Sequence, residues 1–102
     1  MNHVVLAGDS IFDNAAYVER GQSVIEQLLA KANNDFDTTL VAVDGSITSE
    51  LAHQFTRLPS ETTHLFISSG GNDALASARL LAESVSTAWQ AMGLFAEVVD
   101  RF

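Results

Sequence analysis

Three short, continuous apolar runs place the tightest limits on how this chain can fold. They cover residues 4–7, 40–43 and 65–67, and each is followed by a cluster of small and polar residues. Continuous runs of this length are typical of strands that are buried on both faces, as in a parallel sheet, whereas half-exposed strands alternate apolar and polar residues. The sequence therefore predicts a parallel sheet with three polar loops at the carboxyl ends of its strands.

Helical patterns separate and follow these strands. Ser23 and Glu26 have the spacing of a capping box, which predicts a helix that begins directly after the serine. A shorter helix is expected at about residues 48–57, and an apolar stripe at spacings of three and four predicts a last helix over residues 81–102. Right-handed crossovers then give a single α/β domain over residues 1–102, a flavodoxin-like α/β/α sandwich with strand order 2-1-3.

This order leaves the third strand, residues 65–67, at an open edge of the sheet. An exposed apolar edge invites pairing with another chain. We therefore expect either that the natural protein continues past Phe102 or that the chain forms a homo-oligomer through the third strand or the C-terminal helix.

Composition excludes several classes of partner. The chain has 13 acidic and 5 basic residues, and its formal net charge is −8. The basic residues are scattered, so we expect neither nucleic acid nor an anionic membrane as a partner. The absence of cysteine removes disulfides and thiolate metal sites. The N-terminus lacks the pattern of a signal peptide and no apolar run is long enough to span a membrane, so a cytoplasmic location is expected.

The three polar loops are expected at one edge of the sheet, where open α/β proteins bind their ligands. Ser10 follows the first run and either presents its hydroxyl at that edge or serves as a turn or cap residue. Gly45 follows the second run and is either an oxyanion donor through its N–H or an ordinary turn glycine. Asn72 follows the third run and is either an amide donor to an oxyanion or a loop or cap residue.

Two other interpretations fit the motifs less well. The segment Gly70-Gly71-Asn72-Asp73 at a helix start could bind an anion, but no P-loop lysine follows it and the chain has no G-x-G-x-x-G motif. The G-x-S-x-G pattern of the α/β-hydrolases is incomplete, because Phe12 stands where its last glycine would be. Nucleotide binding is therefore a weaker hypothesis than an oxyanion site at these three loops.

Taken together, the three loops resemble the first three sequence blocks of the SGNH, or GDSL, hydrolases, in the order of that family. The segments that carry the resemblance are Ala7-Gly8-Asp9-Ser10-Ile11-Phe12-Asp13-Asn14, Val43-Asp44-Gly45-Ser46 and Gly70-Gly71-Asn72-Asp73. The resemblance covers essentially the whole chain but only the front part of the family's domain. It therefore implies a domain that is truncated relative to the full family fold.

The resemblance implies a role for each matching residue. Ser10 would be the nucleophile and, through its N–H, one oxyanion donor. The N–H of Gly45 and the side-chain amide of Asn72 would be the other two donors, with Asp9 in support. The implied activity is the cleavage of a carboxylic ester or thioester of a small molecule through an acyl-enzyme, with no metal or organic cofactor.

The chain departs from the family in the fourth block, a histidine within D-x-x-H, which these 102 residues do not contain. His3 and His64 are expected at the starts of strands, at the opposite edge from Ser10, and His53 is expected on the second helix. We therefore predict little or no esterase activity for this chain alone. The alternative function is a non-catalytic flavodoxin-like module that self-associates through its open sheet edge.

Overall fold

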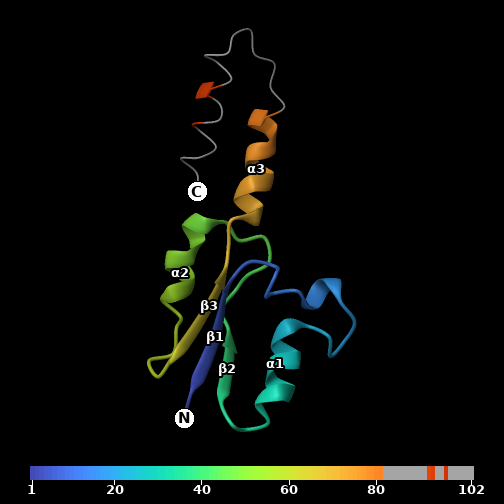
Figure 1. Cartoon of the computed structure of the whole chain (residues 1–102), viewed down its shortest axis with the longest axis vertical. Helices are drawn as coiled ribbons and strands as arrows, with labels where there is room; N and C mark the ends of the chain where they lie inside the picture. The colour runs from blue at the N-terminus through green and yellow to red at the C-terminus, as the bar shows by residue number, and fades with distance from the viewer. Residues whose placement is uncertain (82–91, 94–95, 97–102) are drawn as a thin grey trace. The chain divides into compact units, whose positions relative to one another are not determined.

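The three predicted strands form one parallel sheet with the order β2-β1-β3 in a computed structural model of the chain (Figure 1). The strands are β1 (His3–Gly8), β2 (Asp37–Leu40) and β3 (His64–Ser68). β1 lies in the middle and pairs in parallel with both neighbours. The α/β class and the 2-1-3 strand order are therefore confirmed.

The structure describes residues 1–81, 92–93 and 96, and the chain divides into two units. The first unit, Met1–Ser69, contains the whole sheet, and the second, Gly70–Phe102, begins with α3 (Gly71–Leu81). The single domain over residues 1–102 stays a prediction. The helix predicted over residues 81–102 lies almost entirely outside the described residues. Among those that are described, no helix has the length and apolar character needed to cross a membrane.

The helix α1 (Val24–Ala32) begins where the capping box predicts. The Oγ of Ser23 accepts the N–H of Glu26 at 3.3 Å and donates to the Glu26 carboxylate at 2.6 Å. The hydrogen bond from Ser23 lowers the pKa of the Glu26 carboxyl below its usual value of 4.5. The helix ends at Asn33, whose left-handed backbone is a common way to stop a helix.

The two crossovers place α1 and α2 on opposite faces of the sheet, as their right-handed sense requires (Figure 1). The second crossover is built from a short 3₁₀ turn, η2 (Thr48–Glu50), and α2 (Leu51–Phe55), where a single helix over about residues 48–57 is predicted. The core of the first unit lies on the α2 face of the sheet. It consists of Val5, Ala7 and Val41, with Phe55 and Leu58 packed against them.

The second strand starts and ends earlier than its apolar run predicts. β2 covers Asp37–Leu40, whereas the run predicts a strand over residues 40–43. Past β2, the N–H groups of Val41 and Ala42 both donate to the carbonyl of Leu6, at 2.9 and 3.0 Å. Two successive donors on one acceptor insert an extra residue, as in a β-bulge, so the regular ladder stops although the chain still follows β1.

The third strand is more exposed than its apolar run predicts. The residues Leu65, Phe66 and Ile67 are 39%, 54% and 50% exposed, whereas Val5 in β1 is fully buried. The prediction of strands buried on both faces is therefore correct for β1 and wrong for β3. The reason is position, because α1 packs on β2 and α2 packs on β1, which leaves the edge strand without a covering helix in the first unit.

Candidate active site

Ser10 lies in the turn directly after β1, at the carboxyl edge of the sheet. The chain makes one helical turn here, because the carbonyl of Asp9 accepts the N–H groups of Phe12 at 3.2 Å and Asp13 at 2.9 Å. The Asp9 carboxylate also accepts the N–H of Ile11 at 3.1 Å, as the side chain of a helix cap does. Ser10 is therefore held, half-buried, at the first position of a capped helical turn.

Asp9 also ties this turn to β3. Its N–H donates to the carbonyl of Ser68 at 3.0 Å, and its carboxylate lies 3.5 Å from the Ser68 hydroxyl. The preceding residue, Gly8, has a φ of 120°, and a Cβ there would overlap the carbonyl oxygen of Ser68. Only glycine fits this position, so the close approach of the two backbones fixes the direction in which the chain leaves β1.

Gly45 lies in the turn that follows residues 41–43, with a φ of 86°, which glycine adopts without strain. Two hydrogen bonds hold this turn to the loop that carries Ser10. The Asp13 carboxylate accepts the N–H of Asp44 at 2.7 Å, and the Tyr17 hydroxyl donates to the Asp44 carboxylate at 2.7 Å. The latter bond raises the pKa of Tyr17 above its usual 10.0, and the negative charges of Asp44 and Asp13 add to the effect.

The N–H groups of Ser10 and Gly45 donate to no residue that the structure describes, and the Ser10 hydroxyl has no partner there either. Each of the two N–H groups stands between neighbours whose own N–H groups are bonded. Those neighbours are Asp9 and Ile11 on one loop and Asp44 and Ser46 on the other. Through Ser10 and Gly45, each of the two loops therefore offers a free backbone donor at the carboxyl edge of the sheet, and donors of this kind stabilise an oxyanion.

Gln54, in α2, is a residue of this region that the sequence analysis does not predict. Its buried carboxamide accepts the N–H of Gly8 at 2.7 Å and donates to the Gly8 carbonyl at 2.7 Å and the Ser46 hydroxyl at 3.0 Å. A signal for it exists, because Leu51, Gln54 and Phe55 share one helix face by their spacing. A polar residue on a face that packs against a sheet has to find partners, since buried polar groups are hydrogen-bonded.

Asn72 is the second residue of α3 and belongs to the second unit. The helix begins at Gly71, with Asp73 in its first turn and the N–H of Ala74 donating to the carbonyl of Gly70 at 3.0 Å. Asp73 is therefore a residue of the first turn of α3. Ser10 belongs to the first unit, so a meeting of Asn72 with Ser10 stays a prediction.

The histidines lie where the sequence predicts. His3 and His64 begin β1 and β3, at the opposite edge from Ser10, and His53 is exposed on α2. His3 is buried, and its Nε2 lies 2.7 Å from the Thr39 hydroxyl. No hydrogen bond among the described residues joins a histidine to Ser10, and within the same part of the chain no three acidic or histidine side chains are grouped to hold a metal ion.

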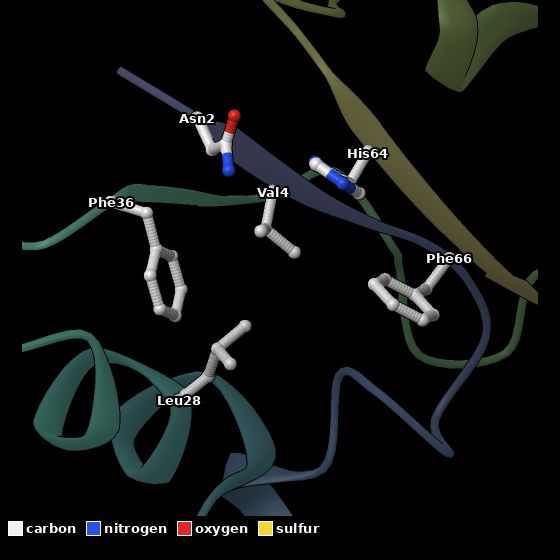
Figure 2. Close-up of a pocket in the computed structure, with 6 residues that line it drawn as sticks. All are labelled: Asn2, Val4, Leu28, Phe36, His64 and Phe66. Carbon is white, nitrogen blue, oxygen red and sulfur yellow. The ribbon is translucent and has the colours of Figure 1, made fainter.

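An apolar groove of about 310 Å³ lies on the α1 face of the first unit (Figure 2). It is formed by side chains from α1, β1 and β3 and from the segments that lead into the strands. The lining residues are Asn2, Val4, Leu28, Phe36, His64 and Phe66. The groove contains none of the predicted site residues, so it is a feature separate from the candidate active site.

Comparison with known proteins finds a likeness in fold. No family model matches the sequence, and no curated protein matches it. Among solved structures, the chain is similar to a mutant of the esterase AlinE4, with 20% sequence identity and a TM-score of 0.55 over 98% of this chain. The matched region is 54% of the esterase, so the chain spans about half of that protein's length. At this identity the likeness shows a shared fold.

Proposed function

We propose that this chain carries the nucleophile and oxyanion donors of an SGNH-type serine hydrolase that acts on carboxylic esters or thioesters. The observation that carries the proposal is the pair of unpartnered N–H groups, of Ser10 and Gly45, on two loops that are tied together at the carboxyl edge of the sheet. Two further observations agree with the proposal. Ser10 and Gly45 follow one another along the chain in the order of the family's sequence blocks, and the chain shares its fold with an esterase.

In the proposed reaction, the hydroxyl oxygen of Ser10 attacks the acyl carbon while its proton passes to a base. The carbonyl oxygen becomes an oxyanion that accepts from the N–H groups of Ser10 and Gly45 and from the side-chain amide of Asn72. The C–O or C–S bond then breaks, the leaving group takes the proton from the base, and the acyl group stays on Ser10. A water molecule then attacks the acyl carbon while the same base takes a proton from it. The bond between the acyl group and Ser10 breaks, the base returns the proton to the serine oxygen, and the carboxylic acid is released.

The base is the missing component, because the 102 residues contain no D-x-x-H motif. Removing one member of a catalytic triad lowers the rate by roughly four to six powers of ten. We therefore propose that the chain alone turns over esters very slowly and that imidazole, added as an external base, partly replaces the histidine. The test measures release of p-nitrophenol from p-nitrophenyl butyrate with and without imidazole.

Ser10→Ala is the decisive variant in this assay, and Ser60→Ala is its matched control, since Ser60 lies exposed in the turn that leads to β3. Imidazole-dependent release that exceeds the background and disappears in Ser10→Ala, but not in Ser60→Ala, supports the proposal. Equal rates for the unmodified chain and Ser10→Ala overturn it. Fast turnover without imidazole contradicts only the proposed lack of a base.

A second candidate function, self-association through β3, rests on the exposure of that strand. Among the described residues β3 pairs only with β1, and its second edge is open. The strand His64–Ser68 contains no acidic or basic residue other than a histidine, so two copies of this acidic chain can approach here with the least repulsion. Antiparallel pairing of β3 with the β3 of a second copy is self-complementary about a two-fold axis.

The partner proposed for β3 is therefore a second copy of this chain. Light scattering on a size-exclusion column is expected to give a dimer that Phe66→Lys converts to a monomer, because the lysine places a charge in the apolar interface. Leu29→Lys is the control, since Leu29 is an equally exposed apolar residue on α1. A monomer at high protein concentration rules this function out, and so does a dimer that both variants dissociate equally.

A further inference from the structure

A buried side chain of the first unit, that of Gln54, contacts both the end of β1, from which the Ser10 loop leaves the sheet, and the loop that carries Gly45. Gln54 is 1% exposed, and its three hydrogen bonds all go to residues within two positions of the proposed donors. Gly8 comes two residues before Ser10, and Ser46 comes directly after Gly45. Every group in this arrangement belongs to the first unit, Met1–Ser69.

The orientation of the Gln54 carboxamide follows from its partners. A backbone N–H can only donate and a backbone carbonyl can only accept, so the Gln54 oxygen must face the N–H of Gly8 and its nitrogen must face the Gly8 carbonyl. The second N–H of the same nitrogen is then directed to the Ser46 hydroxyl. One planar group thereby uses both of its donors and its acceptor on the end of β1 and on the loop that carries Gly45.

The need for such a group follows from the irregular end of β2. The regular ladder between β1 and β2 stops at the pair formed by Leu6 and Leu40. Beyond it, the N–H of Gly8 has no partner in β2, and Gln54 supplies the acceptor that a further strand residue would supply. A side chain from α2 therefore completes the sheet at the point where the chain leaves it for Ser10.

From this arrangement we infer that Gln54 is a positioning residue, which sets the distance between the N–H groups of Ser10 and Gly45 in the proposed oxyanion site. The inference rests on the proposed hydrolase function for its catalytic meaning. Gln54 would act through Gly8 and Ser46, to which its side chain is hydrogen-bonded.

The variant that tests this role is Gln54→Glu, which keeps the size of the side chain but removes its donors when the carboxyl is ionised. The ionised group then faces the Gly8 carbonyl with a negative charge and repels it. At mildly acidic pH the protonated carboxyl regains one donor, so the effect is expected to reverse. Gln27→Glu is the matched control, because Gln27 is exposed on α1 and undergoes the same change of charge.

The first measurement is the NMR spectrum of the backbone amides at mildly alkaline and mildly acidic pH. In Gln54→Glu the resonances of Ser10 and Gly45 are expected to shift at alkaline pH and to return toward their unmodified positions in acid. Gln27→Glu is expected to leave both resonances in place. If Gln54→Glu moves neither resonance, or moves only one of them, the inference is wrong.

The second measurement is the imidazole-dependent release of p-nitrophenol at mildly alkaline pH. Because a misplacement of about 1 Å can cost on the order of 10²-fold in rate, Gln54→Glu is expected to lower kcat by 10- to 10²-fold with little change in KM. A loss confined to KM overturns the role. Reversible shifts of the two amides in a chain that shows no Ser10-dependent release support the positioning role and overturn the hydrolase proposal, so the two failures are distinguishable.

A measurement on the unmodified chain covers the case in which Gln54→Glu does not fold. The side-chain amide protons of Gln54 are expected to exchange with water far more slowly than those of exposed Gln27, because both bind partners inside the first unit. Equal exchange rates for the two glutamines overturn the inference.

Discussion

Gly8 carries the chain past β3 at a distance that leaves no space for a side chain. Its φ of 120° lies in a region that other residues rarely adopt, and a Cβ would overlap the Ser68 carbonyl oxygen. On its other side the backbone is held by Gln54. The position of Ser10, two residues later, therefore depends on a glycine that is fixed from both sides.

Gly8→Ala is expected to lower the free energy of unfolding by about 3 kcal/mol or more, since the overlap adds to the backbone strain. Gly21→Ala separates the two effects. Gly21 has a φ of 84° but no atom within 4 Å of an added Cβ, so the same substitution there should cost only about 1 kcal/mol. Urea denaturation of both variants measures the difference, and equal losses would show that the close approach to Ser68 contributes nothing.

Tyr17 reports on the contact between the two loops because it is the only tyrosine in the chain. Its absorbance is expected to titrate above pH 10.0, since ionisation would break its bond to Asp44 and place two negative charges together. The raised pKa means that this contact stabilises the fold below pH 10 and is lost as the pH rises through the folded value. Asp44→Asn should lower the midpoint toward 10.0, whereas Asp35→Asn, at a distant exposed position, should leave it unchanged.

The positions of single residues could be predicted only where a sequence motif marks them. The turn positions of Ser10 and Gly45 follow from apolar runs that end in small polar residues, and the structure places both in turns. Gln54 could not be assigned in this way, because its partners lie up to 46 positions away and the meeting depends on how α2 crosses the sheet. The same holds for the bond between Asp13 and Asp44, which joins two loops across 31 positions.

At the scale of elements, existence was predictable and extent was not. The apolar runs predict three parallel strands because continuous burial requires them, and all three are present. β2 begins at Asp37, since backbone pairing with β1 extends over polar residues that no hydrophobic pattern marks. The exposure of β3 could not be predicted either, because the run of residues 65–67 has the same composition whether or not a helix covers it.

The start of α1 offers a test at this scale. Ser23→Ala is expected to lower the free energy of unfolding by about 1 kcal/mol, because the helix loses the acceptor for the N–H of Glu26. Ser49→Ala is the control, since Ser49 is exposed and its hydroxyl bonds to none of the described residues. Thermal unfolding by circular dichroism measures both variants.

The pH dependence of the same variant can be predicted in sign. Ser23 lowers the pKa of Glu26 in the folded state, so the bond stabilises the fold above pH 4.5 and is lost as the pH falls through the lower folded value. The difference between Ser23→Ala and the unmodified chain should therefore shrink in acid. A difference that stays constant down to the acid transition would show that the carboxylate plays no part in the cap.

At the scale of the whole molecule, charge and exposed apolar surface act against each other. A formal net charge of −8 makes two copies repel, whereas β3 and the adjacent groove are apolar. We therefore expect two copies of the chain to associate through apolar surface only where the electrostatic repulsion between them is weak enough to permit contact.

Salt therefore discriminates between kinds of interface. The screening length falls from about 10 Å at 0.1 M salt to about 3 Å at 1 M, which weakens the repulsion between copies while leaving apolar contacts intact. The dimer fraction measured by sedimentation velocity is thus expected to rise with salt at fixed protein concentration. An interface built on ion pairs would respond in the opposite direction, and that result would exclude β3 as its main component.

The open surroundings of Gly45 bear on which substrates the proposed oxyanion site would accept. Within the described residues, no atom lies within 4 Å of the place where a side chain on Gly45 would begin. If a substrate group lies beside Gly45 in the proposed site, no side chain there would restrict its size, since selectivity comes from contacts that the wrong substrate fails to make or makes too closely. We therefore expect little selectivity for the size of the substrate group that lies beside Gly45. Any preference for chain length has to come from residues elsewhere in the site.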